Sequence, residues 1–326
     1  KSNLLEAIYL LSTTKSLRVE NEDELIKDGE NFLRVEGFLD HPPAGGDTEL
    51  LVIINKPTSE VSFRKKVVVN GISKRVVDFI GNLPAVIFYP SDINMVTGSP
   101  SLRRWHLDLA LAQIDSEYKK SLTLYEQFLT VRNKVLKRIR EGKGRGDELN
   151  YWTEELVQKG KVISEKRQTF FEFINGLETP LGEFRFDYRQ SPVTVERLIE
   201  TNGREVAAAA TLIGPHRDDF VVEALSEVEE QGSGRNLAHY GSRGEQRTAT
   251  LAFKLAQLEY MAKFLGKRPI LLLDDIFSEL DVSHRAHVVE VVGKQQTIIA
   301  TVELENIPKD FLDSARILRV EDGRIT

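Results

Sequence analysis

Residues 268–281 read RPILLLDDIFSELD, and the rest of the sequence is best understood from this stretch. The four consecutive apolar residues 270–273 predict a short strand that is buried on both faces. Two adjacent carboxylates, Asp274 and Asp275, end this strand. Because unpaired charge is costly to bury, they predict a metal ion or a reacting group at the carboxyl edge of a parallel sheet. A helix-capping Asp is the simpler alternative, but it accounts for one carboxylate more easily than for two.

Composition and charge exclude several classes of protein. The chain has 326 residues, enough for two domains, and its 41% hydrophobic and 29% charged residues are typical of a soluble globular protein. It has no apolar run long enough to span a membrane, and we expect no signal peptide. The absence of cysteine excludes disulfides, thiolate catalysis and cysteine-based zinc sites, and a cytoplasmic location fits. With a net charge of −6, contacts to nucleic acid must come from local basic patches.

The first two residues, Lys1 and Ser2, lead directly into a helical pattern with apolar residues at positions 4, 5, 8 and 11. Lys-Ser before a helix is how a phosphate-binding loop, G-x-x-x-x-G-K-[ST], ends. Its Lys reaches the terminal phosphates, its Ser hydroxyl binds Mg²⁺, and the helix N-terminus offers free N–H groups. The dipeptide is a weak signal by itself, but with Asp274 and Asp275 it would complete one metal–phosphate site. The loop glycines are absent from the sequence, so we expect a trimmed or partial chain that, as written, binds ATP poorly or not at all.

Short strands are predicted between residues 33 and 89. The candidates are residues 33–39, 50–54, 65–69 and 86–89, and the Asn70-Gly71 pair predicts a hairpin turn. Lys65 and Lys66 form a small basic cluster with Arg64. A solvated hairpin and a contact to DNA explain this cluster equally well.

The pattern becomes helical from residue 101. Apolar residues recur in steps of three, four or seven up to residue 139, which predicts one amphipathic helix of roughly 60 Å with a coiled-coil-like seam. A glycine-rich reversal at 142–147 and a second helical pattern over 149–174 follow. The simplest structure is an antiparallel helical hairpin, an arm inserted into an α/β domain.

The distal end of this arm is basic. Seven positive residues face one opposing Glu141 within fourteen positions; they are Arg132, Lys134, Lys137, Arg138, Arg140, Lys143 and Arg145. A solvated helix surface needs fewer charges, so we expect a polyanion or an acidic partner to bind here.

The remaining chain alternates between strands and helices. We expect strands at 211–213, 220–223 and 296–301, helices from Ser242 to Ala262 and over 283–292, and a final hairpin near 317–324. A Ser and a Gly at the start of the helix at Ser242 form a second site suited to an anion.

Five motifs occur together in chain order. They are KSNLLEA at 1–7, FYPSD at 88–92 followed by RRWHLD at 103–108, GPHRDD at 214–219, SRGEQR at 242–247, and LLLDDIFSELD at 271–281. Their combination resembles the RecF family of bacterial recombination mediators, relatives of the SMC-type ABC ATPases, over essentially the whole chain. The resemblance implies an α/β fold, an ABC-type ATPase head with a mixed sheet and flanking helices, carrying an inserted antiparallel helical arm. It implies an N-terminal lobe at 1–100, the arm at 101–200 and a C-terminal lobe at 201–326.

The resemblance also implies roles for the residues at the predicted metal–phosphate site. Lys1, Ser2 and Asn3 are similar to the end of a Walker A motif, where Ser2 binds Mg²⁺. Asp274 resembles the Walker B aspartate on Mg²⁺, and Asp275 stands where ABC ATPases usually carry the Glu that polarises the attacking water.

Other motif residues would act from a second copy of the chain. Ser242, Gly244 and Glu245 are similar to the ABC signature, which contacts the γ-phosphate bound by the opposite subunit. Asp281 is similar to the D-loop residue at the same interface.

The implied function is an ATP-dependent homodimer, with ATP and Mg²⁺, that binds double-stranded DNA and single-strand/double-strand junctions. It would help load a recombinase during repair and replication restart, with RecO and RecR as partners and no membrane. Three features predict slow ATP hydrolysis that serves as a switch. Asp275 is one methylene shorter than Glu, Ser91 stands where the family commonly has Glu, and Thr301-Val302 lacks the histidine of the ABC switch.

Two other functions remain open from the sequence. One is a transporter ATPase subunit, against which the helical arm and the GPHRDD segment argue. The other is a purely structural SMC-like head, for which a hairpin of about 75 residues is too short. Binding to duplex DNA would separate the mediator from the transporter subunit.

Overall fold

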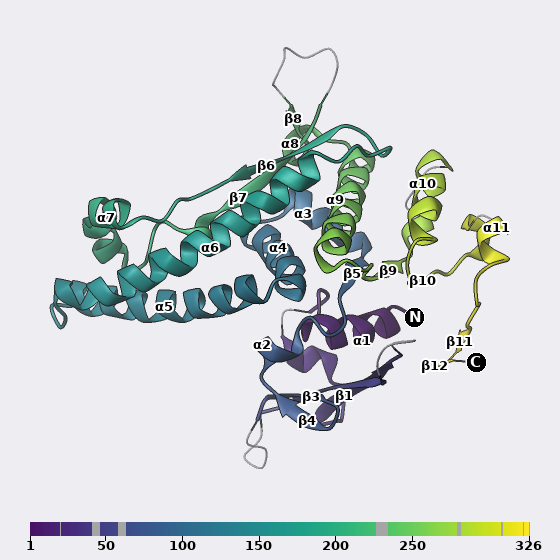
Figure 1. Cartoon of the computed structure of the whole chain (residues 1–326), viewed down its shortest axis with the longest axis horizontal. Coiled ribbons are helices and arrows are strands. Elements are labelled where there is room, and N and C mark those ends of the chain that lie inside the picture. The colour runs from purple at the N-terminus through teal and green to yellow at the C-terminus, as the bar shows by residue number, and fades with distance from the viewer. Residues whose placement is uncertain are drawn as a thin grey trace. The chain divides into compact units, whose positions relative to one another are not determined.

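The structure is a computed structural model, shown in Figure 1. It describes residues 1–19, 21–40, 46–57, 63–225, 234–278, 282–307, 309–321 and 323–325. The chain divides into two compact units: the first unit is residues 1–91 with 261–326, and the second unit is residues 92–260. Residues 201–260, which we expected in the C-terminal lobe of the head, therefore lie in the same unit as the helical arm. No helix in the described ranges is long and apolar enough to cross a membrane.

The first unit contains a three-stranded parallel sheet. Its strand order is β10 (Thr297–Ala300), β9 (Ile270–Asp274) and β5 (Ala85–Phe88). The three leucines of β9 are buried. The predicted buried strand is therefore confirmed, and it ends in the two aspartates as expected.

The first unit also contains an antiparallel sheet. Its order is β1 (Phe32–Leu39), β2 (Thr48–Asn55), β3 (Lys65–Val69) and β4 (Ile72–Lys74). Asn70 and Gly71 both have positive φ, 49° and 74°, as a two-residue type I′ hairpin requires. The strands predicted at 33–39, 50–54 and 65–69 are confirmed as β1, β2 and β3. Helix α1 (Ser2–Thr13) contributes Leu10 and Leu11 to the core under this sheet.

Shorter elements complete the first unit. They are η1 (Glu22–Leu25), α2 (Val76–Phe79), η2 (Pro90–Ile93), which continues into the second unit, η5 (Ile276–Ser278), α10 (Val282–Val292), η6 (Leu304–Asn306), α11 (Lys309–Leu312), β11 (Val320–Glu321) and β12 (Arg324–Ile325). The predicted helix over 283–292 and the predicted C-terminal hairpin are both confirmed.

The helical arm is confirmed in the second unit, where α5 (Ser116–Arg140) and α6 (Asn150–Asn175) run side by side (Figure 1). The prediction of one helix from residue 101 to 139 is wrong. The chain breaks after α4 (Pro100–Ile114), at Asp115, whose carboxylate accepts the N–H groups of Glu117 and Tyr118. Asp115 thus caps a new helix, and α5 alone spans about 38 Å.

A second antiparallel sheet, of three strands, packs with the arm. Its order is β6 (Phe184–Arg189), β7 (Asp219–Ala224) and β8 (Arg235–Asn236). The other elements of the second unit are α3 (Asn94–Thr97), η3 (Gly146–Leu149), α7 (Val195–Ala208), η4 (Pro215–Arg217), α8 (Leu237–Tyr240) and most of α9 (Arg243–Leu265). Aromatic rings join these elements: Phe220 of β7 stacks on Phe253 of α9 with ring centroids 5.3 Å apart.

The predicted strand at 211–213 is absent from the described fold. Side chains, not a neighbouring strand, satisfy its backbone: Asn133 accepts the N–H of Thr211, and Glu205 accepts the N–H of Leu212. Because these N–H groups are already bonded to side chains, they are not available to pair with a neighbouring strand.

Candidate functional site

The predicted metal–phosphate residues meet at the carboxyl end of β9. The hydroxyl of Ser2, in the first turn of α1, donates to Oδ1 of Asp274 at 2.9 Å. These residues are 272 positions apart, so the contact depends on the packing of α1 against the parallel sheet. The fold thus joins the two sequence motifs that we expected to form one site.

Asp275 has a strained backbone. Its φ is +49°, in the left-handed region that non-glycine residues seldom adopt. Its N–H donates to the carbonyl of Ala300 at 2.8 Å, which fixes this conformation at the end of β10. The Thr301 hydroxyl lies 3.5 Å from Oδ1 of Asp275, at the outer limit of a hydrogen bond. Strain of this kind, held by its neighbours at a strand end, is typical of a functional site.

The start of α1 offers donors to an anion. Lys1 is the N-cap, and no side chain caps the helix. The first N–H groups of a helix have no partner within it, so they are available to a phosphate. The Lys1 ammonium group donates to the Thr301 carbonyl at 2.8 Å, and Asn3 accepts from Arg18 at 3.1 Å.

These groups fit a magnesium–phosphate ligand. A hydroxyl and a carboxylate supply the oxygen ligands that Mg²⁺ prefers, and an uncapped helix start with an adjacent lysine suits phosphate. Within the described ranges, no group of three or more His, Asp or Glu side chains could hold a metal ion unaided. A metal beside Ser2 and Asp274 would therefore need further ligands, which phosphate oxygens provide.

Ser242 and Glu245 form a capping box at the start of α9. The Ser242 hydroxyl accepts the N–H of Glu245 at 3.2 Å, and the Glu245 carboxylate accepts the N–H of Ser242 at 2.8 Å. Arg235 pairs with Glu245 and, with the Ser242 N–H, lowers its pKa to about 2. Gly244 is exposed, and a Cβ there would meet only the Ser242 hydroxyl, at 4.0 Å. This start of α9 is thus rigid and open to solvent, whereas Asp281 lies outside the described residues.

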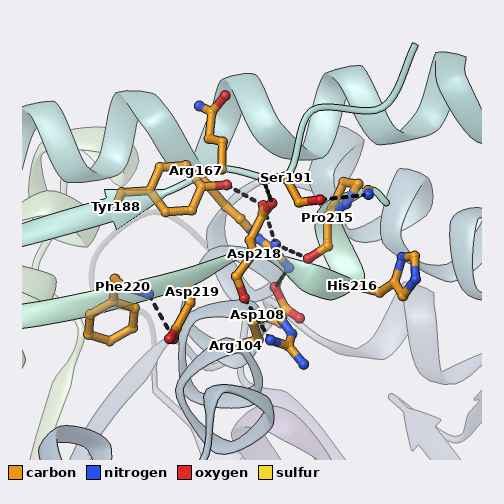
Figure 2. A network of polar contacts seen from close by, with 12 residues as sticks. Arg104, Asp108, Arg167, Tyr188, Ser191, Pro215, His216, Asp218, Asp219 and Phe220 are labelled. Carbon is orange, nitrogen blue, oxygen red and sulfur yellow. Dashed lines mark hydrogen bonds and ion pairs between the residues drawn. The ribbon is translucent and has the colours of Figure 1, made fainter. Parts of the chain in front are cut away.

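The GPHRDD motif forms a buried network around Arg167 of α6 (Figure 2). Arg167 donates to the Pro215 carbonyl at 2.8 Å, to Asp218 at 2.9 Å and to Asp108 at 2.7 Å. The side chains of Arg167 and Asp218 are only 2% and 1% exposed. Asp218 also accepts the N–H of Ser191 at 2.7 Å. Charged groups this deeply buried are tolerated because each one is paired and hydrogen-bonded.

The arginine pair of RRWHLD binds the aspartate pair of GPHRDD. Arg103 makes a bidentate ion pair with Asp219, at 2.7 and 2.9 Å. Arg104 donates to the Asp218 carbonyl at 2.6 Å. From the sequence we assigned no role to the individual residues of these two motifs. Two adjacent arginines in one motif and two adjacent aspartates in another were the signal for this pairing.

His216 is neutral and structural. One ring nitrogen, Nδ1, lies 2.7 Å from the Tyr125 hydroxyl, and the other, Nε2, lies 3.0 Å from the Thr211 carbonyl. A carbonyl can only accept, so Nε2 carries the proton and Nδ1 accepts from Tyr125. Burial lowers the pKa of His216 to about 4.

Acid should therefore destabilise the second unit. The unfolded chain protonates His216 near its usual pKa of about 6.5, whereas the folded chain does so only near 4. The stability that the second unit gains from burying neutral His216 is fully present above pH 6.5 and is lost as the pH falls toward 4. We expect urea unfolding at pH 5 to give a free energy about 1–2 kcal/mol lower than at pH 7 from this group. His216→Gln should lose less stability between the two pH values, and an identical loss would contradict this role.

The basic residues of the first unit are partly used by the fold. Lys65 is mostly buried, with its ammonium group donating to the Thr14 carbonyl at 2.7 Å and to Glu22. Arg64 pairs with Asp23 at 2.8 Å. Lys66 remains exposed, and its Nζ lies 5.9 Å from the centroid of the Phe63 ring. Of the predicted cluster, Lys66 is therefore the residue best placed to meet a partner.

The basic end of the arm is smaller than its sequence predicts. Arg132, which we placed on this surface, is buried and pairs with Glu205 at 2.7 Å. Three of the others face carboxylates; the pairs are Arg138–Glu148, Lys143–Glu141 and Arg145–Asp147. Lys134, Lys137 and Arg140 are exposed, and none of them makes an ion pair with another described residue.

Comparison with known proteins gives the family. No family model matches the sequence. A DNA replication and repair protein RecF from Geobacillus kaustophilus is 33% identical over 351 residues, covering 100% of this chain and 90% of the relative. The chain belongs to the RecF family. A RecF from Herpetosiphon aurantiacus is 35% identical, with the same coverage of both chains.

Solved RecF structures agree with this assignment. A structure of the recombination mediator protein RecF-ATPrS in the RecFOR pathway superposes with a TM-score of 0.82 at 29% identity, covering 99% of this chain and 88% of that one. A RecF-ATP structure gives a TM-score of 0.80 at 30% identity. The expected fold, an ABC-type ATPase head with an inserted antiparallel helical arm, is thus confirmed for this RecF-family chain.

Proposed function

We propose that this RecF-family chain is an ATP-switched, DNA-binding recombination mediator. The observation that carries the proposal is the Ser2–Asp274 contact beside the strained Asp275, at the open end of a parallel sheet. In α/β proteins with a parallel sheet, ligands usually bind just beyond the carboxyl ends of the strands, where this contact lies. The relatives are named for DNA replication and repair, and one solved RecF is described as an ATP complex.

The residues at the start of α1 would hold the nucleotide. Lys1 and the free N–H groups of Ser2 and Asn3 would bind its phosphates. Ser2 and Asp274 would hold Mg²⁺, which neutralises phosphate charge when bound. Asp275 would orient the attacking water and accept its proton.

The second half of the site would come from another copy of the chain. Ser242, Gly244 and Glu245 lie at an exposed helix start, where the Ser242 hydroxyl and backbone N–H groups suit a γ-phosphate. The capping box holds this helix start in place before any ligand binds. Asp281 would lie at the same interface. ATP would thus join two heads, and hydrolysis would release them.

Hydrolysis should be slow, in keeping with a switch. Val302 follows Thr301 where ABC ATPases carry a histidine, and its side chain is exposed and cannot hydrogen-bond. Lys1 and Asp275 both contact Thr301, but no imidazole is available at this place to sense the γ-phosphate.

The exposed basic residues would bind DNA or an acidic partner. We propose double-stranded DNA and single-strand/double-strand junctions as ligands, RecO and RecR as partners, recombinase loading as the outcome, and a cytoplasmic location. Lys66, Lys137 and Arg140, with Arg138 beside them, are the candidate contacts.

Neutralising the unpaired cations of the arm should weaken DNA binding. For Lys137→Gln with Arg140→Gln, we expect at least a threefold loss of affinity for DNA. The slope of log affinity against log salt concentration should become less negative by about 2, because about two phosphate contacts are lost. Fluorescence anisotropy with a labelled junction between 50 and 200 mM salt measures both. The matched control is Lys143→Gln with Arg145→Gln, whose charged groups already face Glu141 and Asp147. Equal losses from both double variants would contradict the assignment.

The experiment that tests the proposed function compares DNA binding by the complete gene product with ATP, with ADP and without nucleotide. A mediator switched by ATP should bind junction DNA at least tenfold more tightly with ATP. Equal affinity in all three conditions would argue for the structural-head alternative. Failure to bind DNA would argue for an ATPase of another kind, such as a transporter subunit.

A further inference from the structure

The second unit contains a cavity that the proposed ATPase site does not use. Its volume is about 240 Å³, and it lies between α4, α5 and η4 beside the network of Figure 2. One face of α4 forms its wall, since Ser101, Arg104, Trp105 and Asp108 are spaced three or four residues apart. Ligand pockets for drug-sized molecules are usually about 300–1,000 Å³, so this cavity holds one ring system and not a whole nucleotide.

Two polar groups in the cavity have unused hydrogen-bonding capacity. Asp108 accepts from Arg167 and Tyr118 through Oδ1 alone, and no other described residue bonds to its Oδ2. Arg104 has five N–H donors, of which one bonds to the Asp218 carbonyl within the described structure. These two side chains lie next to each other, one helical turn apart on α4 (Figure 2). The cavity therefore offers an acceptor beside several donors.

The remaining polar groups of the cavity are occupied and form a rigid base. Arg167 is held by Asp108, Asp218, the Pro215 carbonyl and the Tyr118 hydroxyl. Both ring nitrogens of His216 have partners, as described above. A cavity whose walls are fixed in this way is preorganised for a ligand.

Charge and shape indicate the class of ligand. Within the network, the charges of Arg104 and Arg167 are offset by those of Asp108 and Asp218. A phosphate group would gain nothing from this balance. A neutral, planar ring would stack on Trp105, donate from an amino group to Asp108 and accept from Arg104.

We infer that this cavity binds one unpaired nucleobase that carries an exocyclic amino group. The inference rests on the proposed DNA-binding function and assigns it a site for the single-stranded side of a junction. Cytosine presents such an amine and thymine does not, so the cavity distinguishes two bases of equal ring size.

Trp105 provides a direct signal for this binding. These 326 residues contain two tryptophans, so Trp152→Phe leaves Trp105 as the only one among them. The complete gene product with this substitution is titrated with dC12 and dT12 in the presence of ATP and Mg²⁺. We expect dC12 to quench Trp105 fluorescence and to bind at least about fivefold more tightly than dT12.

A substitution tests the donor. Arg104→Gln keeps an amide to bond the Asp218 carbonyl but removes most donors, so we expect at least a fivefold loss of dC12 affinity. The control is Arg189→Gln, whose side chain is exposed outside the cavity and pairs only with Asp187 in the described structure. Circular dichroism shows whether each variant folds, and if Arg104→Gln does not, the comparison of the two oligonucleotides decides.

Two results would overturn the inference. Trp105 fluorescence that stays constant with both oligonucleotides is the result expected if the cavity receives a protein side chain instead. Equal affinity for dC12 and dT12 would remove the role of the amino group. Anisotropy with a labelled junction separates the two proposals. If the protein binds the junction but Trp105 fluorescence does not change, only the cavity assignment is overturned. If the protein does not bind the junction, both the proposed function and this inference are overturned.

Discussion

Replacing Asp275 by Asn is expected to lower ATP turnover at least about 100-fold while leaving ATP-dependent dimers intact. An amide cannot accept the proton of the attacking water, and loss of a general base typically costs about 10²–10⁴ in rate. The Ser2–Asp274 pair is untouched by this change, so nucleotide and metal binding should persist. Asn also tolerates the left-handed backbone of residue 275 better than most residues, so the fold should survive.

Asp274→Asn is the matched control, since it changes the neighbouring carboxylate in the same way. This variant should lose ATP-dependent dimerisation, because a neutral amide is a poor ligand for Mg²⁺ beside Ser2. Phosphate release measures turnover, and sedimentation velocity measures the dimer. Turnover of Asp275→Asn within about threefold of the unmodified protein would contradict the role of Asp275.

Replacing Arg167 by Ala is expected to destabilise the second unit by about 3–5 kcal/mol, the range seen when one partner of a buried ion pair is removed. Asp218 is only 1% exposed, and without Arg167 its carboxylate would be buried without its ion-pair partner. The Pro215 carbonyl and the Tyr118 hydroxyl would lose hydrogen bonds as well. Urea unfolding followed by circular dichroism measures the change.

Arg189→Ala serves as the control for this prediction. Arg189 is 58% exposed and pairs with Asp187 on the surface of β6, so its loss should cost less than about 1 kcal/mol. A similar cost for both substitutions would contradict the structural role of the buried network. Arg167→Ala that also abolishes DNA binding in a folded protein would instead extend the role of the network to the ligand.

Local patterns predicted the parts of the site that depend on neighbours in sequence. The apolar run of β9 and the acids at its end identified a buried strand with a site at its tip. The Lys1-Ser2 pair identified the start of a helix, which the structure shows without a side-chain cap. Both features arise from a few adjacent residues, and so does the hairpin turn at Asn70.

Predictions failed where tertiary contacts decide between alternatives. Asp115 sits at a position compatible with a continuous helix, but its carboxylate caps a new one. Arg132 belongs to a basic run in sequence, yet Glu205 of α7 holds it in the interior. Neither the cap nor the buried pair can be inferred from periodicity, because each depends on a side chain's orientation or on a partner 73 residues away.

The network around Arg167 could not be predicted from sequence patterns either. Its members come from α4, α6 and the segment before β7. The charged members are arginines and aspartates, residue types that usually lie on the surface. Only the fold shows that their charges cancel in the interior and border a cavity.

The central claim is that ATP joins two copies of this chain through a site made from both. Sedimentation velocity of the complete gene product at micromolar concentration, with ATP and Mg²⁺ and then with ADP and Mg²⁺, tests it most directly. We predict a dimer with ATP and a monomer with ADP, and a monomer in both conditions when Ser242→Arg blocks the exposed start of α9. A sedimentation coefficient that is the same with ATP and with ADP would contradict the claim.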